Sequence, residues 1–153
     1  MTRAVSFLIP FSIGALMMSA AGAAENGTRD EAVALVGKVA ERIQQIGAEA
    51  AYKEFSDPKG AFVDRDLYVF CANMDAVVQA HGSNRAMIGQ NLKMLKDTDG
   101  KVFIAEMLQI AAASGEGWVD YKWPNPQTKK IEAKSSFFRK IGNDVCAVGV
   151  YKK

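Results

Sequence analysis

The sequence predicts an α+β domain in which a long N-terminal helix packs on one face of a five-stranded antiparallel sheet. Apolar residues first recur at helical spacing, over residues 28–46, and short apolar or alternating runs follow. Most connections between these runs are too short for parallel crossovers, which leaves antiparallel neighbours. The segment over residues 82–114, a loop followed by a helix over residues 101–114, covers the other face. The expected strands span residues 67–73, 77–81, 116–123, 130–140 and 144–152.

The first 23 residues have the composition of an export signal. Arg3 supplies one positive charge, residues 4–18 are almost entirely apolar, and Ala21-Gly22-Ala23 fits the A-x-A pattern of a cleavage site. We predict cleavage after Ala23, which leaves residues 24–153 as a single domain in the periplasm or outside the cell. An uncleaved membrane anchor is the weaker alternative, because small residues before the site suit a signal peptidase better than a packed span.

The predicted mature chain is almost electrically neutral. The full chain has 19 lysines and arginines and loses only Arg3 on cleavage, so the mature chain has 18 basic and 17 acidic residues. No basic block stands out, and nucleic-acid binding usually needs a clustered basic face, so we exclude that class. A chain of this length buries roughly two-thirds of its unfolded surface, which is enough for one core.

Two helices are expected before the first strand. Thr28-Arg29-Asp30-Glu31 fits a capping box, in which the Thr28 hydroxyl accepts from the Glu31 N–H and the Glu31 side chain reaches back. Apolar residues continue at helical spacing to Ile46. Gly47 then breaks the helix, and a shorter one over residues 48–55 ends at the Ser-Asp-Pro-Lys-Gly sequence that follows.

Two cysteines lie in runs that are expected to form strands. If the strands that hold Cys71 and Cys146 are neighbours, one disulfide joins them, as is common in exported proteins. Two buried free thiols are an equally open alternative at this point. The chain has no C-x-x-C motif, so redox chemistry and a zinc site both lack their usual signature.

The strand over residues 116–123 holds both tryptophans. A period of two puts Tyr121 and Trp123 on one face and Trp118 on the other. A turn follows at Pro124, and the returning strand carries Lys134 among small residues. Amphipathic rings near a lysine equip a pocket for a small polar or anionic molecule. The alternative is that aromatic residues are simply favoured in strands and fill the core, while Lys134 is solvated.

Two further side chains are candidates for the same pocket. Tyr68 and Phe70 are two residues apart and share one side of the first strand, where core packing explains Phe70. His81, the only histidine, ends the second strand beside a polar loop. It could donate to a carboxylate, and a pKa near neutrality would make binding pH-dependent, although a structural histidine is the commoner case. Gly149 lacks bulk in a strand, which suits close approach of another group or simple packing.

The chain offers little for catalysis. Acid–base and nucleophilic mechanisms need a positioned histidine, paired carboxylates, or a Ser or Cys beside a base. The acidic segments at residues 64–66 and 97–100 lack the full spacing of a calcium loop, and turn capping explains them. We predict no enzyme activity, no cofactor and no metal site.

The motifs across the mature chain resemble those of a single-module Cache domain. They are Asp57-Pro58-Lys59-Gly60-Ala61-Phe62-Val63, Asp66-Leu67-Tyr68-Val69-Phe70, Met74-Asp75, Ala80-His81, Ile88-Gly89, Gly115-Glu116-Gly117-Trp118-Val119-Asp120-Tyr121-Lys122-Trp123-Pro124-Asn125-Pro126, Lys134-Ser135-Ser136-Phe137 and Gly149-Val150-Tyr151. The resemblance implies a PAS-like sheet with a long N-terminal helix and a site for a small extracytoplasmic molecule, often a short carboxylate. It also implies that the first and last strands are neighbours at the sheet centre, which favours the Cys71–Cys146 bridge. The ligand-binding residues would be Tyr68, His81, Tyr121, Trp123 and Lys134.

The chain departs from this family pattern in one respect. Cache modules usually precede a transmembrane helix and a cytoplasmic output, whereas this sequence stops at Lys153. We therefore expect a free-standing exported Cache protein, not an integral membrane protein after cleavage, that either presents its ligand to a membrane receptor or sensor kinase or acts as a scavenger. The alternative is an extracytoplasmic interaction module that binds a membrane sensor or another protein without a small ligand.

Overall fold

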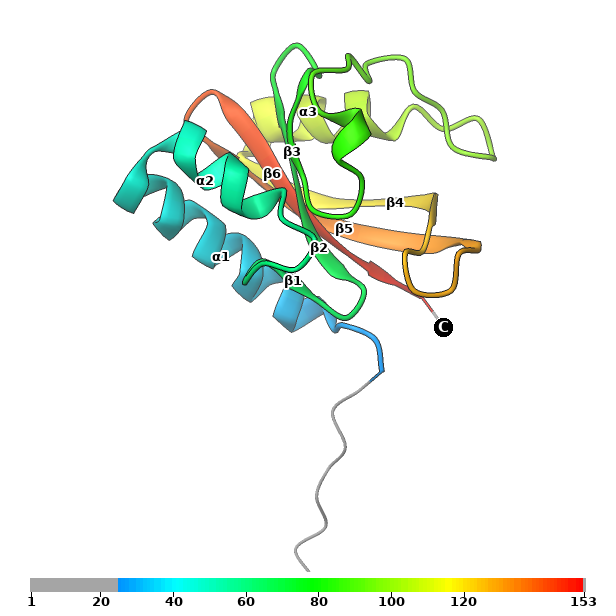
Figure 1. The fold of residues 1–153 in the computed structure, drawn as a ribbon. Coiled ribbons are helices and arrows are strands. Elements are labelled where there is room, and N and C mark those ends of the chain that lie inside the picture. The colour runs from blue at the N-terminus through cyan, green and yellow to red at the C-terminus, as the bar shows by residue number, and fades with distance from the viewer. Residues whose placement is uncertain (1–24, 153) are drawn as a thin grey trace, which may run out of the picture.

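The computed structural model describes residues 25–152, which form a sheet with helices on both faces (Figure 1). The predicted export segment, residues 1–23, lies outside the described residues. The helices are α1 (Arg29–Ile46), α2 (Ala48–Phe55), the 3-10 turn η1 (Arg85–Met87) and α3 (Phe103–Ser114). The strands are β1 (Val63–Asp64), β2 (Leu67–Asn73), β3 (Val78–His81), β4 (Glu116–Pro124), β5 (Ile131–Ile141) and β6 (Asp144–Tyr151).

The sheet is antiparallel, with the strand order β1-β2-β6-β5-β4, and β3 pairs with β2. All five predicted strands are present, and β1 is a two-residue addition. It pairs with the start of β2, where Val63 lies opposite Tyr68, while β3 pairs farther along, where His81 lies opposite Phe70. The first and last of the predicted strands, β2 and β6, are neighbours at the centre of the sheet.

Helix α1 begins as its sequence predicts. The Thr28 hydroxyl accepts from the Glu31 N–H at 3.2 Å, and the Glu31 carboxylate accepts from the Thr28 N–H at 2.7 Å. The helix ends at Gly47, whose φ of 83° is readily adopted only by glycine, and α2 starts at the next residue. Within residues 25–152, no helix combines the length and the apolar character that a membrane span needs.

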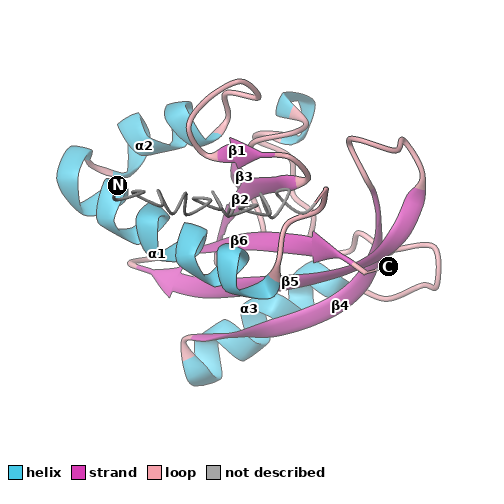
Figure 2. Cartoon of the chain, turned by 90° about the horizontal axis from the view of Figure 1, so that it is seen from below, coloured by secondary structure: helices cyan, strands magenta, loops and turns pink. Residues whose placement is uncertain are grey.

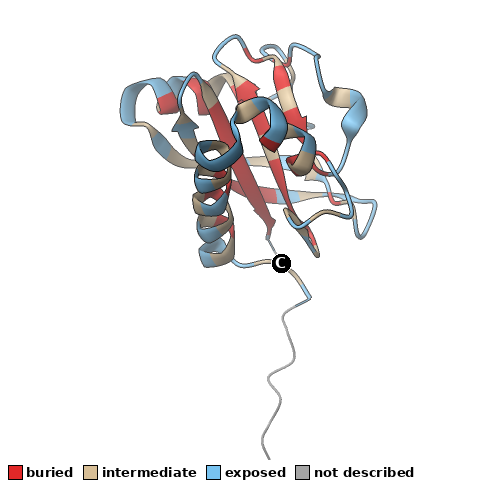
Figure 3. Cartoon of the chain, turned by 60° about the vertical axis from the view of Figure 1, so that its left-hand side comes forward, coloured by how far each residue is buried: buried red, intermediate tan, exposed pale blue. Residues whose placement is uncertain are grey.

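Helices α1 and α3 lie on opposite faces of the sheet (Figure 2), and an apolar core lies under each. One core packs α1 and α2 on the sheet, and the other packs α3 and the segment before it on the other face. Neighbouring residues of β6 divide between them, since Val148 belongs to the first core and Ala147 to the second. The central strands are accordingly buried along most of their length, while the outer faces of the helices are exposed (Figure 3).

A disulfide joins the two central strands. Cys71 and Cys146 lie directly opposite each other in the β2–β6 register, with their Cα atoms 4.1 Å apart, and their sulfur atoms are bonded. Both residues are fully buried in the first core. The predicted bridge is therefore confirmed, and the alternative of two free thiols is wrong.

The segment between β3 and α3 is largely irregular. Residues 92–95 form one hydrogen-bonded turn, in which the Leu95 N–H donates to the Leu92 carbonyl at 3.1 Å, while Asn91 forms an isolated bridge with Val77 and a short helix lies earlier, at η1. The isolated bridge also explains why β3 begins at Val78, one residue later than expected.

Helix α3 begins at Phe103, two residues after the predicted start. The reason is that the Lys101 N–H donates to the Asp97 carboxylate at 2.8 Å, so that this residue belongs to a turn before the helix. The helix ends as expected at Gly115, which has a φ of 83°.

Candidate functional site

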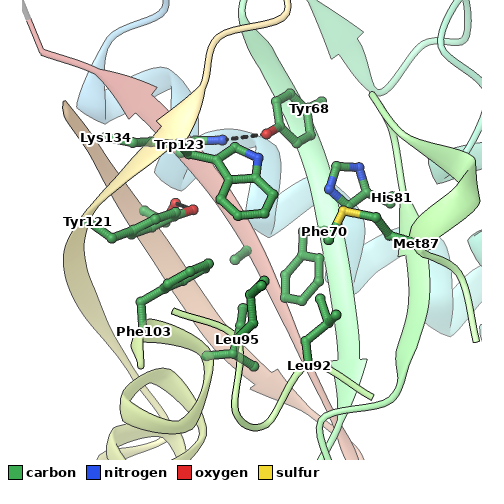
Figure 4. A pocket seen from close by; sticks show the side chains of 14 residues that line it. Tyr68, Phe70, His81, Met87, Leu92, Leu95, Phe103, Tyr121, Trp123 and Lys134 are labelled. Atoms are coloured by element: carbon green, nitrogen blue, oxygen red, sulfur yellow. Dashed lines mark hydrogen bonds between the residues drawn. The ribbon is translucent and has the colours of Figure 1, made fainter. Parts of the chain in front are cut away.

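A small cavity lies between the sheet and the segment that precedes α3 (Figure 4). We call the covering residues 82–104 the roof. The cavity volume is about 20 Å3, which is room for about one water molecule. Its polar lining residues are Tyr68, His81, Tyr121, Trp123, Lys134 and Ser136. Its apolar lining residues are Phe70, Met87, Leu92, Leu95, Phe103, Ile104, Ala147 and Gly149.

The strand register brings the predicted residues of the hairpin together. Tyr121 of β4 lies opposite Lys134 of β5, which in turn lies opposite Tyr151 of β6. Directly opposed residues share a face, and so do residues two apart along one strand, which adds Trp123. Trp118, as predicted, lies on the other face, where the Arg29 guanidinium stacks on its ring at 3.6 Å.

Lys134 is the only charged side chain in the lining, and it is only 2% exposed. Its ammonium donates to the Tyr68 hydroxyl at 2.8 Å and lies 4.0 Å from the centre of the Tyr68 ring. Within residues 25–152, none of the ion pairs involves Lys134. A buried ammonium that lacks a carboxylate partner is costly, and its hydrogen-bond acceptor among the described residues is the Tyr68 hydroxyl.

Three phenolic hydroxyl groups form hydrogen bonds on this face of the sheet, and that of Tyr68 contacts the ammonium. The Tyr68 and Tyr151 oxygens are 3.5 Å apart, and the Tyr151 hydroxyl donates to the Pro124 carbonyl at 2.7 Å. The Tyr121 hydroxyl is 2.8 Å from Ser136 Oγ. Burial raises the pKa values of Tyr121 and Tyr151, so both phenols keep their protons. Tyr121, which lines the cavity, therefore presents a protonated hydroxyl there, whereas the Tyr151 proton is used by the Pro124 carbonyl.

Burial also acts on the pKa of Tyr68, but with the opposite outcome. Burial alone would raise the pKa of Tyr68. The charge of the neighbouring Lys134 ammonium and the hydrogen bonds to the phenol oxygen outweigh burial, so the pKa lies below its ordinary value. Tyr68 is thus the hydrogen-bond acceptor for the Lys134 ammonium.

His81 lies in the cavity wall as a neutral imidazole. Its Nδ1 accepts from the Ser83 N–H at 3.3 Å and the Asn84 N–H at 3.0 Å, which places the ring proton on Nε2. The ring stacks on Tyr68 with 5.2 Å between centroids. Burial and the Lys134 charge lower its pKa to about 3, so the expectation of a pKa near neutrality is wrong. At neutral pH His81 can offer one N–H donor but no charge.

This shifted pKa predicts a pH dependence of stability. In the unfolded chain His81 binds a proton near its ordinary pKa of 6.5, whereas in the folded protein it remains neutral down to about pH 3. The free energy of unfolding therefore falls as the pH is lowered from about 6.5 to about 3. We expect the free energy of unfolding to lose about 2 kcal/mol between pH 7 and pH 5 through this residue alone. Urea unfolding of the wild type and of His81→Asn at both pH values measures this loss. An equal change in the free energy of unfolding between pH 7 and pH 5 in the two proteins would contradict the prediction.

The apolar part of the lining comes mostly from the roof. Met87 belongs to η1, Leu92 and Leu95 follow it, and Phe103 stacks on Tyr121 with ring centroids 4.1 Å apart and planes 4° apart. Sequence reasoning missed these residues, and it assigned Phe70 to the core alone although this ring also lines the cavity. Apolar residues scattered in the polar stretch before α3 were the available signal.

The acidic segment at residues 97–100 has a structural role. The Asp97 carboxylate accepts from the N–H groups of Asp99, Lys101 and Lys122, and Asp99 forms an ion pair with the Lys122 ammonium. These bonds fasten the end of the roof to β4. Among residues 25–152, no cluster of three or more potential metal ligands occurs.

Comparison with known proteins places the chain among sensors. The family described as single Cache domain 2 matches residues 13–151. Methyl-accepting chemotaxis protein McpP of Pseudomonas putida is 29% identical over 76 residues, and sensor histidine kinase MctS of Rhizobium johnstonii is 35% identical over 89 residues. These segments cover 50% and 57% of this chain but only 14% and 19% of the two relatives.

Solved structures share the fold. A methyl-accepting chemotaxis protein from Vibrio parahaemolyticus superposes with a TM-score of 0.70 at 19% identity, covering 80% of this chain and 86% of that one. A Cache chemosensory domain, whose structure is described as the basis for carboxylic acid recognition, has a TM-score of 0.68 at 22% identity, covering 81% of this chain and 92% of that one. At these identities the likeness concerns the fold alone.

Proposed function

Because this chain belongs to the single Cache domain 2 family, we propose that its cavity binds a short monocarboxylate as the input of a sensory system. One observation carries the proposal: Lys134 is 2% exposed and makes no ion pair within the described residues. Carboxylic acid recognition by the structurally similar Cache chemosensory domain supports the same ligand class.

The polar end of the cavity matches a carboxylate. A carboxylate offers two oxygens that accept several hydrogen bonds, and the Lys134 ammonium and the Tyr68 and Tyr121 hydroxyls can supply them. His81 can add its Nε2 proton. An amine ligand would instead place a second positive charge beside Lys134, so amines are disfavoured.

The other end of the cavity limits the ligand to one charged group. Met87, Leu92, Leu95 and Phe103 offer apolar surface and no partner for a second charge. A dicarboxylate or an amino acid would therefore bury an unpaired charge at this end, at a cost of roughly several kcal/mol. A short alkyl tail fits this end chemically.

The size of the cavity keeps the ligand short. A volume of about 20 Å3 holds about one water molecule, so even a small acid has to displace roof side chains. The roof is largely irregular in structure, with η1 and one isolated bridge. Such segments move more readily than strands of a sheet.

Calorimetric titration of the purified protein tests the function. We expect heat of binding with acetate or propionate, and none with propionamide, propylamine, succinate or alanine. Propionamide is the sharpest control, because it keeps the shape of propionate without the charge. At a ligand concentration 100 times the Kd, the melting temperature should also rise, since about 2.7 kcal/mol of stability is added. Absence of binding by all short monocarboxylates would refute the proposal, and binding of propionamide with equal affinity would refute its electrostatic basis.

We propose further that the domain works outside the cytoplasm with a membrane receptor or sensor kinase as its partner. A buried disulfide persists in oxidising compartments, and the relatives are a chemoreceptor and a sensor kinase.

Domains of this family bind ligands and do not transform them. Recovery of unchanged propionate after prolonged incubation with the protein supports binding alone, whereas a new product would contradict it.

A further inference from the structure

Gly149 of β6 lies beneath the side chain of Lys134. A Cβ atom built on Gly149 would be 2.0 Å from Lys134 Cε and 3.0 Å from Lys134 Cδ, both far inside van der Waals contact. It would also be 2.3 Å from Ser136 Oγ, on the residue opposite Gly149 in β5. The lysine stem thus occupies the space that any other residue at position 149 would fill.

This space lies on the path between the lysine and its partner. Lys134 belongs to β5 and Tyr68 to β2, and β6 separates these two strands in the sheet. The ammonium nevertheless reaches the Tyr68 hydroxyl at 2.8 Å, so the stem has to cross β6 along the surface of the sheet (Figure 4). A residue without a side chain in β6 makes that crossing possible.

We propose that Gly149 is the positioning residue that holds the Lys134 ammonium flat against the sheet at the polar end of the cavity. The part of this inference that concerns ligand affinity rests on the proposed function. Since Gly149 itself has no side chain to offer a ligand, it acts through Lys134.

The geometry separates this role from simple packing. The atoms that an added methyl group would meet are the far end of a flexible lysine and a serine hydroxyl that can rotate. Gly149→Ala should therefore fold, with the ammonium moved away from Tyr68. We expect propionate affinity to fall at least tenfold, a loss of about 1.4 kcal/mol.

The control is Gly117→Ala, which adds the same methyl group to a strand glycine outside the cavity. Its Cβ would meet Ile110 at 3.0 Å and Phe138 at 3.1 Å, so it should affect stability but leave propionate affinity unchanged. A spectroscopic signature accompanies the binding test. Without the ammonium beside it, Tyr68 loses the influence that lowers its pKa, so tyrosinate absorbance should appear at higher pH in Gly149→Ala and not in Gly117→Ala.

A double-mutant cycle completes the test. In a Lys134→Ala background, Gly149→Ala should lose most of its cost in free energy of unfolding, because the lysine stem is then absent and only the Ser136 hydroxyl, which can rotate, remains beside the added methyl group. Additive unfolding energies would overturn the inference even if the wild type failed to bind any carboxylate. If the wild type binds propionate, equal affinity in Gly149→Ala would overturn the inference and leave the proposed function standing.

Discussion

Replacing Lys134 by methionine should abolish carboxylate binding and at the same time stabilise the unliganded protein. Lys134 is 2% exposed and its ammonium has one phenolic acceptor, so the desolvation of this charge is poorly compensated without a ligand. Methionine fills a similar volume with no charge. We expect a gain of about 1–2 kcal/mol in the free energy of unfolding, by analogy with buried ionic groups replaced by apolar ones. We expect a loss of about 100-fold or more in affinity for propionate, since a charge-assisted contact is removed.

Lys122→Met is the matched control for this change. Lys122 also lies in a strand of the hairpin, but its side chain is 46% exposed and pairs with Asp99 at the surface. Surface pairs contribute about 0–1 kcal/mol, so the control should lose little stability and bind propionate like the wild type. Chemical denaturation and calorimetry on both variants give the answer. If Lys134→Met proves less stable than the wild type, the ammonium has compensation that the proposed function does not include.

Removal of the disulfide should produce the largest loss of stability. The bridge closes a loop of 75 residues between the two central strands, and a loop of that length restricts the unfolded chain strongly. We expect the Cys71→Ala/Cys146→Ala double variant to lose about 4 kcal/mol of unfolding free energy. Urea denaturation of the oxidised wild type and the double variant measures the difference.

Reduction provides an independent check on the same bridge. Dithiothreitol should lower the denaturation midpoint of the wild type and leave the midpoint of the double variant unchanged. An effect of the reductant on both proteins would show that it acts elsewhere. Since the cysteines lie in the core opposite the cavity, the double variant should keep its affinity for propionate at temperatures where it is folded.

Much of the part of the site that lies on the sheet was predictable from the sequence, because successive side chains of a β-strand alternate strictly between its two faces. Tyr121 and Trp123 share a face through that period alone, and the hairpin turn after Pro124 brings Lys134 opposite Tyr121. The neighbouring position of β2 could not be obtained in this way. It depends on long-range pairing with β6, which the family resemblance supplied.

The roof and the ionisation of His81 were beyond the sequence pattern. Leu92 and Leu95 lie in an irregular segment, where no repeating period assigns a side chain to a face. The pKa of His81 depends on burial and on the charge of Lys134, which is 53 positions away in the chain, so local sequence gives no hint of it. The sequence marks Gly149 only as a strand residue that allows close approach or simple packing, because the atoms that fill its space come from another strand.

The bond between Cys71 and Cys146 also restricts how the protein can respond to its ligand. Covalently fastened strands cannot slide past each other at the middle of the sheet, so β2 and β6 form a rigid base for the cavity. We therefore expect a rearrangement that admits a ligand to involve the roof, residues 82–104, rather than β2 and β6. Occupancy of the cavity would then be expressed at the exposed surface of that segment, on the side of the sheet away from α1.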